Sequence, residues 1–150
     1  MTILNPSYLT ESRAVFTNFR ASAIMDNMNI TFEEFGELLD EITDNLPEAI
    51  FVNLNGGVNL SPETVSHPKA TDDNLFILGQ YNHGGNLGRY ITIFYGSFMQ
   101  IYGKVPLDYL KKQIDRVLRH EFMHHLESMA GEKDLELQDE IDLLRYTTKR

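Results

Sequence analysis

The segment from Pro106 to Gly131 constrains the fold most, because it carries a long and regular helical pattern. Its apolar side chains cover roughly half of the helix circumference, which is typical of a helix packed into a core. Pro106 suits the first turn of a helix and Gly131 suits its C-cap. The apolar positions are Leu107, Leu110, Ile114, Val117, Leu118, Phe122, Leu126 and Met129. The segment therefore predicts a core helix.

A His-Glu-Phe-Met-His run at residues 120–124 lies at the edge of this apolar face. His120 and His124 are four residues apart, so their rings project from the same side of the helix and can bind one metal ion. Glu121 lies about 100° further round, where its carboxylate can reach a water on that metal rather than the metal itself. This is the arrangement of zinc hydrolases. The alternative is a chance register of two histidines and a solvated glutamate, but unpartnered histidines would be costly on so apolar a helix.

Composition narrows the possible classes of protein. The chain has 150 residues, which fits one domain with a hydrophobic core, and it contains no cysteine. Disulfides and thiolate metal sites are therefore excluded, which leaves histidines and carboxylates as metal ligands. The formal net charge of −9 argues against binding to nucleic acid or to an anionic membrane through a general basic surface. With no candidate membrane span and no visible signal peptide, we expect a cytoplasmic protein.

A second helix is clearly marked near the start of the chain. Thr31 and Glu34 form a capping box, apolar residues follow at helical spacing, and the helix is expected to end near Pro47. The less regular residues 1–29 are predicted to be an N-terminal arm or extension, and residues 30–150 are predicted to be the folded domain.

Strand patterns separate the two helices. Strands are predicted at residues 49–54, 75–81 and 89–95, the last extending towards Tyr102, and residues 59–74 are predicted to be a loop. A final helix is expected at residues 135–146. The order predicts an α+β domain in which a small three- to four-stranded sheet packs on the helix that carries the histidine pair.

A catalytic zinc ion needs a third protein ligand besides the two histidines. Glu127 lies one turn further on the same helix face, and Asp134 lies just past the helix end. Asp139 and Glu140 lie on the expected last helix. If the chain reverses direction just after the histidine helix, these two residues come beside His124, because each helical residue advances about 1.5 Å along the axis. Each of these acids is otherwise an ordinary solvated side chain.

The remaining histidines have plainer interpretations. His125 points to a different helix face from the pair, so we expect it to be packed or half-exposed rather than metal-bound. His83, in a glycine-rich segment, and His67, before a proline, are expected to be exposed loop residues.

Several segments together resemble the minimal zincins, a small bacterial family of zincin-like metallopeptidases. They are the helix start Thr31-Phe32-Glu33-Glu34-Phe35 with Leu46-Pro47 at its end, the Leu75-to-Tyr81 segment, the Ile91-to-Tyr95 strand, and the run His120-Glu121-Phe122-Met123-His124-His125. The histidine run is the specific part. The resemblance implies a single minimal zincin-like domain that binds Zn²⁺ through His120 and His124, with Glu121 as catalytic base.

The third ligand departs from the family pattern, which has a Gly three residues after the second His and an Asp three residues after that Gly. Glu127 and Ala130 hold these positions here. Gly131 and Asp134 restore the Gly-x-x-Asp spacing after about one extra helical turn. The resemblance therefore implies Asp134 as the third zinc ligand.

The resemblance implies a zinc-dependent metallopeptidase that acts on a peptide or protein substrate. An extended peptide is expected to pair with the free edge of the strand at residues 89–95. The alternative is a non-catalytic metal-binding or protein-interaction domain with the same fold, because fold does not guarantee activity. A non-peptide amide as substrate also stays open, whereas the acidic charge disfavours a ribonuclease.

Overall fold

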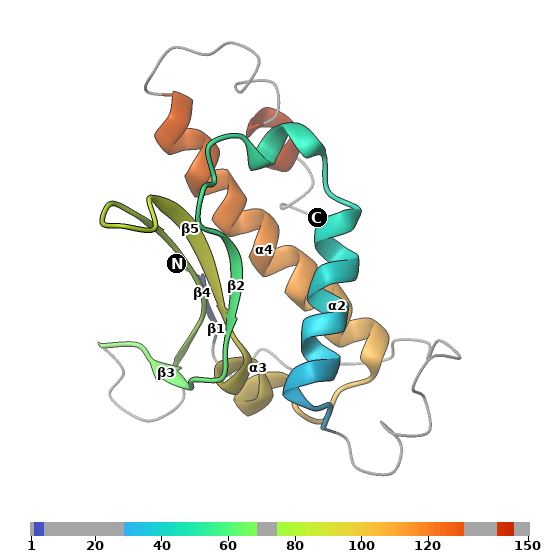
Figure 1. Ribbon diagram of the computed structural model, residues 1–150. Coiled ribbons are helices and arrows are strands. Elements are labelled where there is room, and N and C mark those ends of the chain that lie inside the picture. Colours follow the sequence, from blue (N-terminus) through green and yellow to red (C-terminus); the bar gives the residue numbers. More distant parts are fainter. Residues whose placement is uncertain (1, 5–28, 69–74, 131–140, 146–150) are drawn as a thin grey trace.

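The structure is a computed structural model that describes residues 2–4, 29–68, 75–130 and 141–145 (Figure 1). The elements in these residues are β1 (Thr2–Leu4), α2 (Phe32–Asp44), the 3-10 helix η2 (Glu48–Phe51), β2 (Gly57–Ser61), β3 (Val65–Ser66), β4 (Phe76–His83), β5 (Arg89–Phe94), α3 (Tyr95–Tyr102) and α4 (Leu107–Ala130). Residues 141–145 are also helical. The α+β fold expected from the sequence is confirmed.

The strands form one mixed sheet in the order β1-β4-β5-β2, with the short β3 beside β4. β5 is antiparallel to β4 and parallel to β2. β1 and β3 both pair with Phe76 and Ile77, so they lie along opposite edges of β4. Because β5 is flanked on both sides, the expectation that a peptide pairs with a free edge of residues 89–95 is wrong.

Helix α4 crosses one face of this sheet and contacts β4, β5 and α2 (Figure 1). It spans residues 107–130 and buries the apolar positions that the sequence pattern identified. Helix α2 begins with the predicted capping box: the backbone N–H of Glu34 donates to Thr31 Oγ1 at 3.1 Å, and the N–H of Thr31 donates to Glu34 Oε1 at 3.4 Å. The two strongest helical patterns in the sequence are therefore confirmed.

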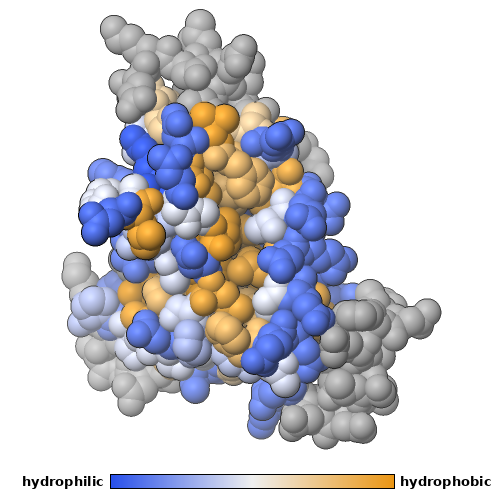
Figure 2. All heavy atoms as spheres, in the orientation of Figure 1, coloured by the Kyte–Doolittle hydropathy of each residue, from blue (hydrophilic) through white to orange (hydrophobic). Residues whose placement is uncertain are grey.

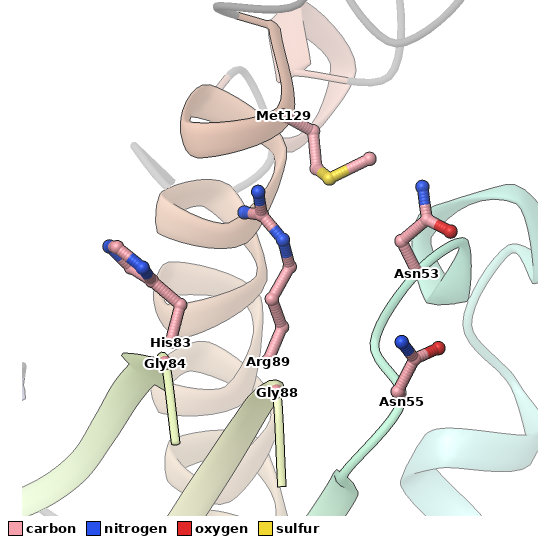
Figure 3. A pocket seen from close by; sticks show the side chains of 7 residues that line it. All are labelled: Asn53, Asn55, His83, Gly84, Gly88, Arg89 and Met129. Carbon is pink, nitrogen blue, oxygen red and sulfur yellow. The ribbon is translucent and has the colours of Figure 1, made fainter. Parts of the chain in front are cut away.

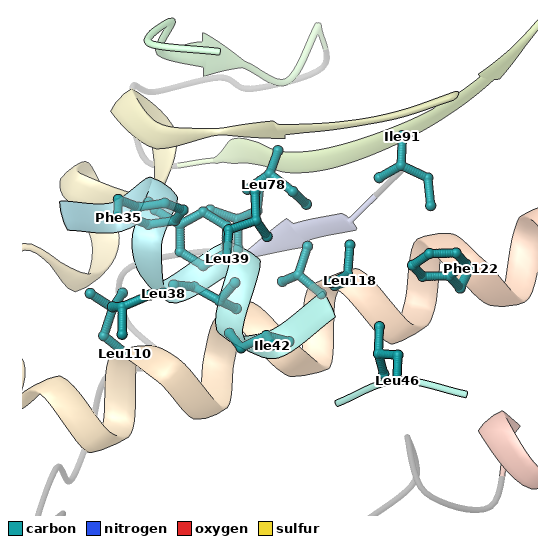
Figure 4. Close-up of a cluster of buried hydrophobic side chains, with 14 of the residues drawn as sticks. Phe35, Leu38, Leu39, Ile42, Leu46, Leu78, Ile91, Leu110, Leu118 and Phe122 are labelled. Carbon is teal, nitrogen blue, oxygen red and sulfur yellow. The ribbon is translucent and has the colours of Figure 1, made fainter. Parts of the chain in front are cut away.

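The hydrophobic core fills the space between the sheet, α2 and α4. Figure 4 shows Phe35 and Leu39 from α2 facing Leu118 of α4, below Leu78 and Ile91 of the sheet. Each such side chain stabilises the fold by about 1.5–3 kcal/mol when fully buried. Figure 2 shows a band of hydrophobic residues on the face of the molecule between β2 and α2, bordered by hydrophilic side chains. The core fixes α4 over the sheet and so fixes the histidine run against β4.

Three predicted elements differ in the structure. Residues 49–54 were expected as a strand but begin in η2, because a short apolar run fits one buried helical turn as well as a strand. The strand at 89–95 ends at Phe94 and gives way to α3, whose buried residues Phe98, Ile101 and Tyr102 recur at helical spacing. The expected loop at 59–74 overlaps the end of β2 and contains β3, which are strands of five and two residues.

Two predictions fall partly outside the described residues. Of the predicted N-terminal arm, Thr2–Leu4 form β1 and join the sheet. Of the predicted final helix, residues 141–145 are helical, and Ile141 and Leu144 are buried. Among the described residues, no helix is both long and apolar enough to cross a membrane.

Candidate metal centre

Helix α4 brings the rings of His120 and His124 together. Their Nε2 atoms lie 3.1 Å apart, and the two rings meet edge to face with centroids 4.7 Å apart. Both side chains are half-buried. The two nitrogens therefore converge on one point beside the helix, as the spacing of four residues predicts.

This separation fits a zinc ion. Tetrahedral Zn²⁺ with Zn–N bonds of about 2.0–2.1 Å holds two nitrogen ligands roughly 3.3 Å apart. The 3.1 Å between the Nε2 atoms is close to that value. The half-buried position lowers the pKa of His120, and the adjacent His124 lowers it further, against the opposing effect of the Glu121 carboxylate. A lowered pKa keeps the imidazole neutral, which is the form that binds a metal.

Glu121 lies on the row of α4 that faces the sheet and is fully buried. A Cβ atom built on Gly79 of β4 would lie 3.3 Å from Glu121 Cγ, which is closer than an ordinary van der Waals contact. Glu121 thus occupies the space between helix and sheet, next to His120. The predicted base is therefore beside the predicted ligands and shielded from bulk solvent.

The third ligand is not found among the described residues, where no group of three His, Asp or Glu side chains comes together. Glu127 points elsewhere: its Oε1 accepts a hydrogen bond from Nη2 of Arg145 at 2.7 Å. Asp134, Asp139 and Glu140 lie outside the described residues. The structure therefore brings together His120, His124 and Glu121, and Asp134 stays a prediction.

His125 is fully buried on the sheet-facing row and belongs to a hydrogen-bonded chain. Its Nε2 donates to the carbonyl oxygen of Val52 at 2.8 Å, which accepts only, so Nδ1 is the acceptor for the hydroxyl of Tyr81 at 3.1 Å. Nη1 of Arg89 donates to the same hydroxyl at 3.0 Å and to Ser128 Oγ at 2.6 Å. This chain ties β4, β5, α4 and the segment after η2 together behind the histidine pair.

The electrostatics of this chain favour a neutral His125. Burial lowers its pKa, the hydrogen bond to the Val52 carbonyl acts in the opposite direction, and the charge of Arg89 lowers it further. The expectation that His125 is packed rather than metal-bound is consistent with full burial and two hydrogen-bonded ring nitrogens.

Two hollows open beside the C-terminal part of α4. The first, here called the His124 hollow, has a volume of about 380 Å³ and is lined by Tyr81, His83, His124 and Ser128. The second, here called the Arg89 hollow, has a volume of about 370 Å³ and is lined by Asn53, Asn55, His83, Gly84, Gly88, Arg89 and Met129 (Figure 3). His83 lines both. It is exposed, as expected, but it stands at the end of β4 rather than within a loop.

Sequence reasoning missed Tyr81, Arg89 and Ser128. Ser128 could have been found, because it follows His124 by four residues on the same helix and so lies on the same face. Tyr81 and Arg89 stand on neighbouring strands, and their meeting depends on the register of β4 with β5, where His83 is opposite Arg89. No local sequence pattern predicts the register of β4 with β5.

The fold and the site together define an α+β protein whose central helix presents a histidine pair beside an antiparallel β-hairpin. The chain is similar to a solved structure, a conserved hypothetical protein from Thermo thermophilus, with 31% identity and a TM-score of 0.60. The alignment covers 69% of this chain and 100% of that one, so this chain belongs to the same family as that protein. No protein-family model matches the sequence, and no curated protein matches it.

Proposed function

We propose that this protein is a zinc-dependent metallopeptidase of the zincin type, active on peptide bonds. The observation that carries the proposal is the 3.1 Å approach of His120 Nε2 to His124 Nε2, with Glu121 next to them on the same helix. Two imidazoles at the separation of zinc ligands, with an adjacent carboxylate, are a site for metal-assisted hydrolysis. The His124 hollow gives this site access to a substrate.

Each residue has a defined part in the proposed chemistry. When bound, zinc would supply Lewis acidity, which activates water and polarises the scissile carbonyl. His120 and His124 hold the ion, and Asp134 is the proposed third ligand. Glu121 takes the proton from the attacking water and passes it to the leaving amine. Its burial against Gly79 keeps the side chain out of bulk solvent.

The edge of β4 offers a place for an extended peptide. β1 pairs with β4 at residues 76–79, and on that same edge the stretch from Gln80 to His83 is not paired with any described strand. Side chains alternate along a strand, so Tyr81 and His83 point to the same face and both line the His124 hollow. A peptide that adds to this edge would pass beside His124. The β4 edge therefore replaces the β5 edge as the proposed substrate position.

Replacing Glu121 by Gln tests the proposal. Glu121→Gln is isosteric, so the purified protein should retain zinc at the wild-type stoichiometry. Cleavage of a mixed peptide library, followed by mass spectrometry, should fall by about 10²–10⁴, the usual contribution of a general base. Glu127→Gln is the matched control, because Glu127 lies on the same helix but pairs with Arg145 at the surface. It should cleave at the wild-type rate.

The alternative of a non-catalytic metal-binding or interaction domain is favoured by one observation, the complete burial of Glu121. In this alternative the enclosed carboxylate serves to hold α4 against the sheet and does not activate water. The same experiment separates the two functions. Wild-type protein that binds zinc but cleaves no peptide in the library supports the non-catalytic domain, and full activity in Glu121→Gln rules out the proposed base.

A further inference from the structure

The Arg89 hollow is lined by polar groups from three parts of the chain. Arg89 comes from β5, His83 from the end of β4, and the amides of Asn53 and Asn55 from the segment after η2 (Figure 3). Among the residues that the structure describes, those that line it include no Asp or Glu, although the whole chain carries a net charge of −9. A guanidinium charge with neutral amide donors nearby is suited to a carboxylate.

The walls of this hollow are held in place before any ligand arrives. His125 Nε2 donates to the carbonyl of Val52, directly before Asn53, and the backbone N–H of Gly56 donates to the carbonyl of Arg89 at 2.8 Å. Asn53 has a φ of 60°, in the left-handed region that asparagine adopts more readily than most residues. Backbone in this region persists where the surroundings determine it, and it clusters at ligand sites. The hollow is therefore preorganised, which lowers the entropy cost of binding.

The hollow also adjoins the proposed active site. His83 lines both hollows, and Nη1 of Arg89 bonds to Tyr81 and Ser128, which both line the His124 hollow. An extended ligand that lies beside His124 can therefore reach Arg89 and His83 with the residues that adjoin the bound part. The volume of about 370 Å³ lies within the range of ligand pockets and is large enough for an acidic side chain.

We propose that the Arg89 hollow is a subsite that binds a carboxylate of a peptide, with Arg89 supplying the charge and Asn53 and Asn55 supplying hydrogen bonds. The carboxylate belongs either to an acidic side chain or to the chain terminus, since both present the same group. This inference rests on the proposed peptidase function for the peptide nature of the ligand. Binding itself requires no turnover and no metal.

The test is a binding titration on the full chain in the Glu121→Gln background, with chelator present to keep zinc from capturing carboxylates. Three probes are used: acetyl-Ala-Ala-Glu-Ala-Ala-amide, the same peptide with Gln in place of Glu, and the Gln peptide with a free C-terminal carboxylate. Backbone amide shifts are followed by NMR. We expect saturable shifts at Asn53, Asn55 and Arg89, with at least about tenfold tighter binding of one or both carboxylate probes than of the neutral one.

Charge variants locate the effect. Asn55→Asp and Asn53→Asp place a carboxylate in the hollow and should weaken binding of the acidic probe by at least about tenfold through like-charge repulsion. Asn86→Asp is the matched control, because it adds the same charge to the β4–β5 connection at an exposed position that does not line the hollow. Its binding should equal that of the parent protein.

The acidic side-chain probe and the free-terminus probe tell the two sources of the carboxylate apart. Equal binding of all three probes, or shifts confined to residues away from the hollow, would overturn the subsite. Peptidase activity without any preference for acidic peptides would leave the proposed function intact and sink only this inference. Carboxylate binding by a wild-type protein that cleaves no peptide would leave the subsite intact and count against the proposed peptidase function.

Discussion

Gly79 of β4 lies directly opposite Glu121 of α4, so close that a Cβ atom at position 79 would stand 3.3 Å from Glu121 Cγ and 2.9 Å from Val117 Cγ1. The absence of a side chain at this one strand position is what allows helix and sheet to approach with a carboxylate between them. The relationship links stability and the proposed chemistry, because the same contact sets both the packing of α4 and the place of Glu121.

Gly79→Ala should therefore destabilise the protein and displace Glu121. Overpacking of this kind costs about 1–3 kcal/mol, which urea denaturation can measure. Peptide cleavage, if the proposed function is correct, should fall more than the loss of folded protein explains.

Gly36→Ala is the matched control for this substitution. Gly36 lies inside α2, and among the described residues its added Cβ would meet Leu60 Cδ2 alone, at an ordinary 3.7 Å. Removing a glycine from a helix interior should stabilise the fold by about 0.5–1 kcal/mol. Equal effects of the two substitutions would contradict the close approach at Gly79.

Tyr81→Phe should weaken the chain of hydrogen bonds behind the site. It removes the donor to Nδ1 of His125 and the acceptor for Arg89, and leaves a fully buried ring nitrogen without its partner. Leaving such a group unsatisfied costs about 1–3 kcal/mol in the free energy of unfolding.

Tyr90→Phe serves as the comparison, because Tyr90 lies on the adjacent strand at a half-buried position. Loss of its hydroxyl should change stability by no more than about 0.5 kcal/mol, the usual effect of a substitution outside a network. A Tyr81→Phe protein as stable as wild type would show that the hydroxyl adds nothing to the fold.

The parts of the fold and site that the sequence predicted are those encoded locally. The capping box at Thr31, the apolar face of α4 and the pairing of His120 with His124 all depend on residues within one or two helical turns. The parts that were missed depend on distant partners. His125 bonds to Val52, 73 positions away, and Arg89 bonds to Ser128, 39 positions away. Such contacts follow from the register of β4 and β5 and from where α4 crosses them, which no single-segment pattern contains.

The same reasoning explains the misread elements. The runs around residues 49–54 and 95–102 are apolar enough to be strands. Tertiary packing favours helical structure in both of them instead. Gly96 illustrates this, because an added Cβ there would meet the backbone of Glu63 at 2.7 Å. α3 thus packs closely against the segment between β2 and β3. Neither segment's own sequence indicates this contact.

Zinc affinity should separate the proposed ligands from their neighbours. His120→Ala and His124→Ala should each weaken zinc binding more than about 100-fold, since even loss of a residue that only supports a ligand costs about 10–100-fold. Asp134→Ala should do the same if Asp134 is the third ligand, whereas Glu127→Ala should not, because Glu127 is paired with Arg145. Competition with a chromophoric chelator measures all four variants. Tight binding in His124→Ala would exclude the pair as the metal site.

The metal-free protein should lose stability in mild acid because of its buried histidines. The pKa values of His120 and His125 are both lowered, chiefly by burial, so the unfolded chain binds protons that the folded chain does not. The free energy of unfolding should therefore be constant above about pH 7.5 and fall as the pH drops below the ordinary histidine value of about 6.5. The limiting slope is about 1.4 kcal/mol per pH unit for each such histidine. Urea titrations from about pH 5 to 8 on His125→Gln should show a smaller slope than wild type, whatever the absolute stability of the variant. An unchanged slope would show that His125 does not titrate differently in the folded and unfolded states.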